Sequence, residues 1–105
     1  MKLSVIIPAY NEERNIAKTI KAIYEYLTIK NIDHEILVSI DGSRDKTADI
    51  AESMRSSIPT LTVINVPVNH GKGYAVKEAM MQATGDYKLF TDADNSTSID
   101  HIERM

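Results

Sequence analysis

The sequence predicts an α/β fold in which a mostly parallel sheet carries helices on both faces. Two observations lead to this prediction. Short runs of apolar residues, most of them followed by a turn signal, alternate along the chain with stretches whose apolar residues recur at helical spacing. The resulting order is four strands separated by three helices, followed by the start of another helix. Strands that are joined by helical crossovers form parallel sheets.

The first strand is expected over residues 3–7, because this run is short and apolar and stops at Pro8. Asn11 is then expected to cap a helix. The apolar residues of that helix recur at steps of four, three and four, which is the stripe of an amphipathic helix. The stripe consists of Ile16, Ile20, Ile23 and Leu27.

The middle of the chain predicts a second strand over residues 35–40, which is rich in Ile, Leu and Val and ends at the turn signal 41–43. Asp45 is expected to cap the next helix. Pro59 breaks the chain before a third strand at residues 61–66. One face of the second helix is expected to consist of Ala48, Ala51 and Met54.

The last part of the chain predicts a loop at residues 69–73, a helix that ends at Thr84-Gly85, and a fourth strand over residues 87–91. Ser98 is expected to cap the start of a further helix. Met80 is expected to be a packing residue, and the residues of the third helix that recur at helical spacing are Val76, Ala79, Met80 and Ala83.

The composition is that of an ordinary soluble globular protein, with 43% hydrophobic and 26% charged residues. A length of 105 residues predicts one domain. The net charge of -3 and the absence of a basic run argue against nucleic-acid binding. Because the chain has no cysteine, disulfides, thiolate metal sites and cysteine nucleophiles are excluded. The apolar start, residues 3–8, is too short for a signal peptide or a membrane span.

Ligands of open α/β sheets bind beyond the carboxyl ends of the strands. In the predicted order, four loops lie there, and they contain most of the polar residues of interest: residues 8–12, 41–45, 69–73 and 92–95. The sequence therefore directs the search for a site to these four loops.

The loop after the fourth strand carries two carboxylates, Asp92 and Asp94, two residues apart. If the chain turns at Ala93, both can point toward one cation. Mg²⁺ and Mn²⁺ prefer oxygen ligands and bridge readily to diphosphates. Such a metal would stabilise the negative charge on a departing nucleoside diphosphate. The alternative is a polar turn, because Asp-x-Asp occurs often by chance.

Two other loops offer contacts for a nucleoside. Asp41 can accept hydrogen bonds from a ribose hydroxyl or a base N–H, and Gly42 permits a close backbone approach. Tyr10 can stack on or flank a base, and Glu12 can bond a ribose. The alternative is structural: an Asp-Gly turn before a helix cap, and a strand ended by Pro8 with acidic residues at a helix N-terminus.

The loop at residues 69–73 is not a P-loop, because the required spacing and the Lys-Ser/Thr pair are absent. Lys72 can reach a diphosphate, and a solvated lysine is the alternative. His70 is expected to be a surface residue rather than a general base, and His34 and His101 are expected to have no partner.

Four segments, taken together, resemble the motifs of family-2 glycosyltransferases. They are residues 5–13, 41–47, 69–75 and 85–94, and their order and spacing agree with the family across nearly all of the chain. Within the family, the run at residues 89–97 is most similar to the branch that glycosylates polyprenyl phosphates, such as dolichyl-phosphate glucose or mannose synthases.

The resemblance implies a GT-A fold, a nucleotide-diphosphate-sugar donor and a lipid-phosphate or saccharide acceptor. It implies Mg²⁺ or Mn²⁺ bound at Asp92 and Asp94, with Asp94 as the main ligand and Asp92 nearer the ribose or the metal. It also implies a cytoplasmic location, at the cytoplasmic face of a membrane that is contacted by regions outside this segment. The residues implied in binding the nucleotide sugar are Pro8, Ala9, Tyr10, Glu12, Asp41, Lys72 and Asp92.

Two departures from the family pattern are visible. The family usually has two acids before Gly-Ser, whereas this chain has Ile40 before Asp41, and Ile40 cannot accept a hydrogen bond. Family members also carry a second half with the acceptor groove and the general base, and no candidate base is found in residues 1–105. The chain is therefore expected to be the donor-binding, N-terminal part of the enzyme, with the acceptor half absent, and to be inactive alone.

Two other classes remain as alternatives. A receiver-like regulatory module, which binds a nucleotide or metal without catalysis, also places Asp residues and a Lys at strand ends. It would need an acidic pair after the first strand, where this chain has Pro8-Ala9-Tyr10. A nucleotidyltransferase would need a Gly-rich loop at the same place, and the chain has none.

Overall fold

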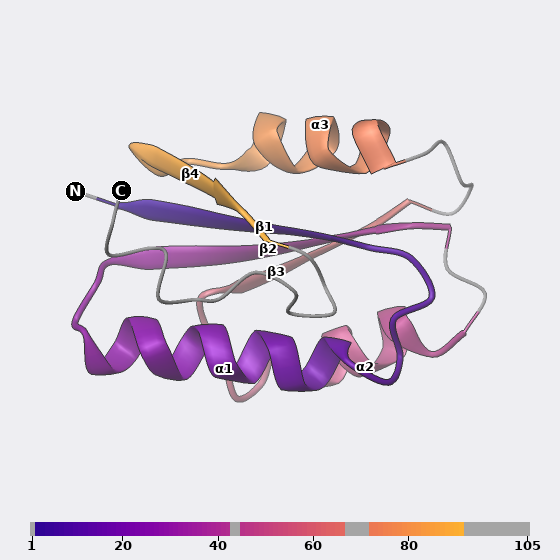
Figure 1. The fold of residues 1–105 in the computed structure, drawn as a ribbon, viewed down its shortest axis with the longest axis horizontal. Helices are drawn as coiled ribbons and strands as arrows, with labels where there is room; N and C mark the ends of the chain where they lie inside the picture. Colours follow the sequence, from indigo (N-terminus) through magenta and orange to yellow (C-terminus); the bar gives the residue numbers. More distant parts are fainter. Residues whose placement is uncertain (1, 43–44, 67–71, 92–105) are drawn as a thin grey trace.

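The structure is a computed structural model that describes residues 2–42, 45–66 and 72–91. Figure 1 shows a sheet with helices on both of its faces. The elements within the described ranges are, in chain order, β1 (Leu3–Ala9), α1 (Ile16–Ile29), β2 (His34–Asp41), α2 (Thr47–Ser53), β3 (Leu61–Val66), α3 (Lys72–Gln82) and β4 (Tyr87–Phe90).

The described strands form one parallel sheet in the order β3-β2-β1-β4. In the pairing of β1 with β2, Leu3 lies opposite His34 and Ala9 lies opposite Ile40. The sheet is parallel because each helix returns the chain to the edge at which the next strand starts. The predicted α/β fold, with a parallel sheet between helices, is confirmed.

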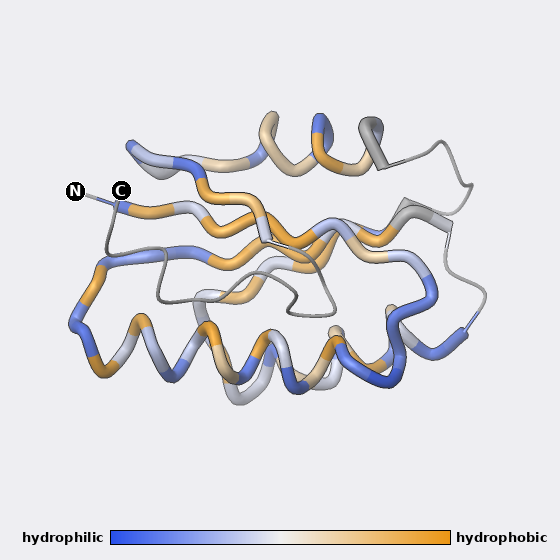
Figure 2. The backbone as a smooth tube through the Cα atoms, viewed as in Figure 1, coloured by the Kyte–Doolittle hydropathy of each residue, from blue (hydrophilic) through white to orange (hydrophobic). Residues whose placement is uncertain are grey.

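The larger part of the core lies between the sheet and the helices α1 and α2. Val5 and Ile7 contribute to it from β1, because alternate side chains of a strand point to the same face. Figure 2 shows hydrophobic residues on the side of α1 that faces the sheet and hydrophilic residues on its outer side. The predicted stripe is therefore confirmed, and its fully buried members are Ile16, Ile20, Ile23 and Leu27.

The smaller part of the core lies between the sheet and α3. Ile6 of β1 and Leu37 of β2 pack against Ala79 of α3. Ala75, one turn earlier, is also buried. Met80 is 43% exposed, so the expectation that it packs in the core is wrong. The buried side of α3 is thus formed by the two alanines, and Met80 is not part of the cluster.

The helix starts differ in part from the prediction. Asn11 does not cap α1, which begins at Ile16 after Asn15. Asn11 lies in the preceding connection with φ at 52°, in the left-handed region that Asn adopts more readily than most residues. The N-cap position of α2 is Lys46 rather than Asp45, and its side chain makes no capping hydrogen bond. Asp45 nevertheless supports the start of the helix, because its Oδ1 accepts the backbone N–H of Thr47 at 3.0 Å.

A hydrogen-bonded cluster joins β1, β2 and the start of β4 at the amino-terminal edge of the sheet. Glu35 Oε2 accepts the Ser4 hydroxyl at 2.6 Å and the backbone N–H of Thr84 at 2.5 Å. Ser4 Oγ in turn accepts the N–H of Gly85 at 2.8 Å. Burial alone would raise the pKa of Glu35, but these bonds and the Lys2 charge outweigh it and hold that pKa below its ordinary value.

The lowered pKa of Glu35 makes the stability of the fold depend on pH. Its ionised form contributes fully above the ordinary pKa of 4.5, and this contribution is lost as the pH falls through the lower folded-state value. We expect the free energy of unfolding to fall more steeply between about pH 5 and pH 3 in the wild type than in Glu35→Gln. Urea unfolding across this range measures the difference, and equal slopes would contradict the role of Glu35.

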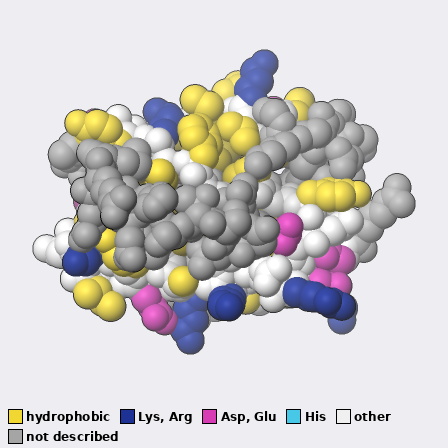
Figure 3. Space-filling view, viewed as in Figure 1, with side chains coloured by type: hydrophobic (Ala, Val, Ile, Leu, Met, Phe, Trp, Pro, Cys, Tyr) yellow, Lys and Arg dark blue, Asp and Glu magenta, His cyan; other side chains and the backbone are white. Residues whose placement is uncertain are grey.

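The outer surface of α1 is charged. Figure 3 shows Lys, Arg, Asp and Glu side chains along the lower margin of the molecule, where α1 and α2 lie in Figure 1. Lys21 and Glu25 form an exposed pair on α1 with an N···O distance of 3.9 Å. No helix in the described ranges is both long and apolar enough to cross a membrane.

Candidate functional site at the carboxyl edge of the sheet

Three neighbouring strands, β2, β1 and β4, have their carboxyl ends at one edge of the sheet. The last residues of β1 and β2 are in register, with Ala9 opposite Ile40. On the other side of β1, the backbone N–H of Thr91 donates to the carbonyl oxygen of Ile6 at 3.1 Å, so the chain after β4 runs toward the same edge. Ligands of open parallel sheets bind at this edge.

Four of the predicted site residues lie in the described part of this edge. Pro8 is half-buried and Ala9 is buried at the end of β1. Tyr10 is 46% exposed, so its ring is available to a ligand. Glu12 is half-buried in the connection to α1. The structure thus brings Tyr10 and Glu12 to the edge at which the sequence places a nucleoside.

For two of the other predicted site residues the structure describes only the backbone, and the rest lie outside the described residues. Asp41 is the last residue of β2 and Lys72 is the first of α3, and the side chains of both are outside what the structure describes. Asp92 and Asp94, the predicted metal ligands, lie outside the described residues. Within the described ranges, no group of three or more His, Cys, Asp or Glu side chains is arranged to hold a metal ion.

The connection after β1 is fastened to the start of α2. The backbone N–H of Glu12 donates to Thr47 Oγ1 at 2.8 Å, and that of Glu13 donates to Asp45 Oδ2 at 3.2 Å. The hydroxyl of Thr47, which is fully buried, donates to Asp45 Oδ1. Sequence reasoning assigned a cap to Asp45 and missed Thr47. Thr47 lies two residues after Asp45 in one of the four motif segments, and this spacing could have indicated that the two residues bond to each other.

Both carboxylate oxygens of Asp45 accept hydrogen bonds, and this lowers its pKa. Burial by itself would raise the pKa of Asp45. Hydrogen bonds from the hydroxyl and the N–H of Thr47, and from the N–H of Glu13, outweigh burial and hold that pKa below its ordinary value. Asp45 is therefore a charged, fixed acceptor at neutral pH.

Ile40, which replaces an acid of the family motif, belongs to the core. Its side chain is fully buried in the cluster between the sheet and α1. A carboxylate there would require buried partners. The isoleucine instead adds apolar contact area, so this position stabilises the packing of the sheet.

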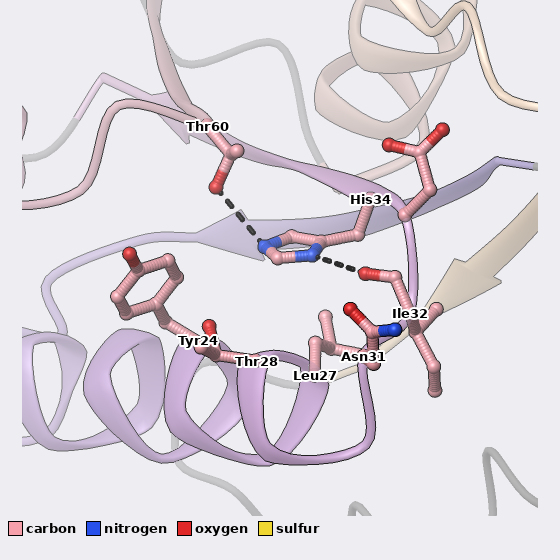
Figure 4. A pocket seen from close by; sticks show the side chains of 8 residues that line it. Tyr24, Leu27, Thr28, Asn31, Ile32, His34 and Thr60 are labelled. Carbon is pink, nitrogen blue, oxygen red and sulfur yellow. Dashed lines mark hydrogen bonds between the residues drawn. The ribbon is translucent and has the colours of Figure 1, made fainter.

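A pocket of about 250 Å³ lies at the opposite, amino-terminal edge, between the end of α1 and the start of β2. Figure 4 shows His34 there between Ile32 and Thr60. Its Nδ1 lies 2.8 Å from the Ile32 carbonyl oxygen, and its Nε2 lies 3.0 Å from Thr60 Oγ1. A carbonyl can only accept, so Nδ1 carries the proton and the ring links two segments. The expectation that His34 has no partner is wrong, and its role here is structural.

The parallel sheet, the helices on both faces and the strand carboxyl ends at one edge define an α/β domain of the open-sheet class. A family model described as Glycosyl transferase family 2 matches residues 4–105. The chain therefore belongs to glycosyl transferase family 2, as the four motif segments predicted. This membership leaves no support for the receiver-like and nucleotidyltransferase alternatives.

Curated relatives include dolichyl-phosphate beta-glucosyltransferases. The chain is 36% identical to the dolichyl-phosphate beta-glucosyltransferase ALG5A of Trichomonas vaginalis over 106 positions, which cover 96% of this chain and 33% of that protein. It is 34% identical to the dolichyl-phosphate beta-glucosyltransferase of Drosophila melanogaster over 112 positions, covering 100% of this chain and 34% of the relative. The chain thus spans about one third of the length of these relatives.

Similar solved structures confirm the GT-A fold. The mannosyltransferase PcManGT from Pyrobaculum calidifontis, in complex with GDP-Man and Mn²⁺, superposes with a TM-score of 0.77 at 32% identity, covering 88% of this chain and 27% of that one. S. aureus TarS 1-349 in complex with UDP-GlcNAc gives a TM-score of 0.75 at 31% identity, covering 99% of this chain and 30% of that one.

Proposed function

We propose that, within the whole protein, this segment binds a nucleotide-diphosphate sugar and a divalent metal ion for an inverting glycosyltransferase. The observation that carries the proposal is that the carboxyl ends of β1, β2 and β4 lie at one edge of the parallel sheet, in a chain of glycosyl transferase family 2. The complexes of PcManGT with GDP-Man and of TarS with UDP-GlcNAc support this class of ligand.

The proposed roles follow the chemistry of each side chain. The ring of Tyr10 flanks the base, and carboxylates at the edge accept hydrogen bonds from the ribose. Lys72 meets the diphosphate, while Asp94 and Asp92 provide oxygen ligands of the kind that Mg²⁺ and Mn²⁺ prefer. The residues proposed to line the nucleoside pocket are Pro8, Ala9, Tyr10, Glu12 and Asp41.

In the proposed reaction, an acceptor oxygen attacks the anomeric carbon from the side opposite the diphosphate. The new C–O bond forms as the bond to the diphosphate oxygen breaks, the electron pair leaves with the nucleoside diphosphate, and the configuration inverts. A divalent ion, when bound, supplies positive charge that stabilises the leaving group. A hydroxyl acceptor needs a general base from outside this segment, whereas a phosphate acceptor is already ionised.

A polyprenyl phosphate is the proposed acceptor, with a saccharide as the other candidate. The dolichyl-phosphate enzymes of T. vaginalis and D. melanogaster support the lipid phosphate. Because the tail of a lipid-linked acceptor lies in a membrane, the reaction would take place at a membrane surface. We propose that this surface is the cytoplasmic face and that regions outside this segment contact it. We also infer that residues 1–105 alone do not complete the reaction, because the acceptor must be positioned by the remainder of the enzyme.

The test is a calorimetric titration of the full-length protein with UDP, GDP, CDP and dTDP, with and without Mn²⁺. We expect one of these nucleotides to bind in a metal-dependent manner. Asp94→Ala is expected to weaken this binding by about 100-fold, because loss of a direct ligand costs at least as much as loss of its outer-sphere support.

Asp33→Ala provides the matched control, because Asp33 is an exposed aspartate at the opposite edge of the sheet. It should bind the nucleotide like the wild type. Nucleotide binding that is equally tight with and without Mn²⁺, and that is unchanged in Asp94→Ala, would overturn the proposed metal site. Failure of all four nucleotides to bind the wild type would overturn the donor assignment.

A further inference from the structure

The backbone of Glu12 connects the starts of two helices. Its N–H donates to Thr47 Oγ1, the first residue of α2, at 2.8 Å. Its carbonyl oxygen accepts the N–H of Asn15 at 3.0 Å and the N–H of Ile16, the first residue of α1, at 2.8 Å. Both backbone polar groups of Glu12 are therefore hydrogen-bonded. The partner of its N–H, which we call the anchor, is the side chain of Thr47, 35 residues away.

The anchor on α2 is itself rigid. Thr47 is fully buried, and its hydroxyl accepts from Glu12 while donating to Asp45 Oδ1. Asp45 Oδ2 accepts the N–H of Glu13 at 3.2 Å, so the carboxylate holds the next residue of the same connection. Because the Thr47 hydroxyl is buried, water cannot take its place if it is removed.

The connection that these bonds hold has a conformation that needs support. Asn11 has φ at 52°, in the left-handed region that few non-glycine residues adopt, although asparagine does so more readily than most, and its neighbours help to hold it there. It lies between Tyr10, whose ring is 46% exposed, and the anchored Glu12. The position of both side chains at the carboxyl edge therefore depends on the anchor.

We propose that Thr47 and Asp45 are positioning residues that hold residues 10–13 in the arrangement needed to bind the nucleoside. The two residues touch no ligand themselves. They couple the connection after β1 to the one after β2, the two segments to which the proposed function assigns the nucleoside. This inference rests on that proposed function, and it adds which residues hold the nucleoside-binding connection in place.

The experiment compares Thr47→Val, which has nearly the same shape but no hydroxyl, with Thr47→Ser, which keeps one. UDP and GDP are titrated with Mn²⁺ into full-length protein at a temperature at which every variant is folded by circular dichroism. Amide hydrogen exchange of Glu12 and Glu13 is followed in parallel. We expect Thr47→Val to lose about tenfold in nucleotide affinity and to lose protection at Glu12, and Thr47→Ser to stay within about twofold of the wild type.

Thr28→Val is the matched control, because Thr28 is an exposed threonine on α1 at the opposite edge. It should leave affinity and exchange unchanged. Unaltered affinity in folded Thr47→Val, even with a lowered melting temperature, would overturn the positioning role and leave the proposed function standing. If the wild type binds neither these two nucleotides nor CDP or dTDP, the proposed function fails, and the positioning role fails with it.

Discussion

In Gly85→Ala, we expect the free energy of unfolding to fall by about 3 kcal/mol, because the added methyl group has no space. A Cβ at this position would lie 2.5 Å from Ser4 Oγ, 2.8 Å from Ser4 N and 2.9 Å from Lys2 O. Two of these three atoms belong to the backbone, so no rotation of a side chain relieves the contact. The chain before β4 would have to move away from β1.

That movement would also damage the cluster around Glu35. The N–H of Gly85 donates to Ser4 Oγ at 2.8 Å, and the same oxygen donates to Glu35 at 2.6 Å. Displacement of Gly85 would leave its buried N–H without its partner, which adds to the steric cost.

Urea unfolding followed by far-ultraviolet circular dichroism measures the effect of Gly85→Ala. Ser57→Ala is a suitable control, because Ser57 is exposed and a surface substitution of this kind changes stability by at most about 0.5 kcal/mol. A loss below about 1 kcal/mol in Gly85→Ala would show that β4 does not approach β1 as closely as the structure has it.

The spacing of apolar residues predicted the fold, because the burial of one or both faces of each strand and helix determines that spacing. The strands at residues 3–7 and 35–40 lie within β1 and β2, since continuous apolar runs are what a sheet covered on both faces requires. Helix α1 was found from its stripe for the same reason. Met80 is an exception, because spacing assigns a residue to one face of a helix but does not determine how deeply its side chain is buried there.

The candidate site was predictable in position but not in detail. The rule that ligands bind at the carboxyl ends of strands located Tyr10 and Glu12 correctly at that edge. The bond from Glu12 to Thr47 spans 35 residues and follows from how β1 and β2 pair, so no local pattern contains it. The roles of Asp92 and Asp94 stay predictions, because both residues lie outside the described part of the chain.

Ile20→Ala is expected to lower the free energy of unfolding by about 3 kcal/mol, whereas Ile29→Ala should change it by less than about 0.5 kcal/mol. The two isoleucines lie on the same helix, α1, and undergo the same chemical change. Ile20 is fully buried against the sheet, and Ile29 is 80% exposed at the end of the helix. Alanine has a slightly higher helix propensity than isoleucine at both positions, so propensity alone would not destabilise either variant.

The difference between the two variants therefore isolates the energy of packing α1 on the sheet. For a chain of this size, a loss of about 3 kcal/mol corresponds to a melting temperature lower by at least about 12 °C, which calorimetry resolves easily. Similar losses in both variants would mean that burial of Ile20 against the sheet does not determine the cost of losing an isoleucine side chain on α1. No loss in either would mean that α1 does not dock through Ile20, and the support that α1 gives to Glu12 at the site would lose its basis.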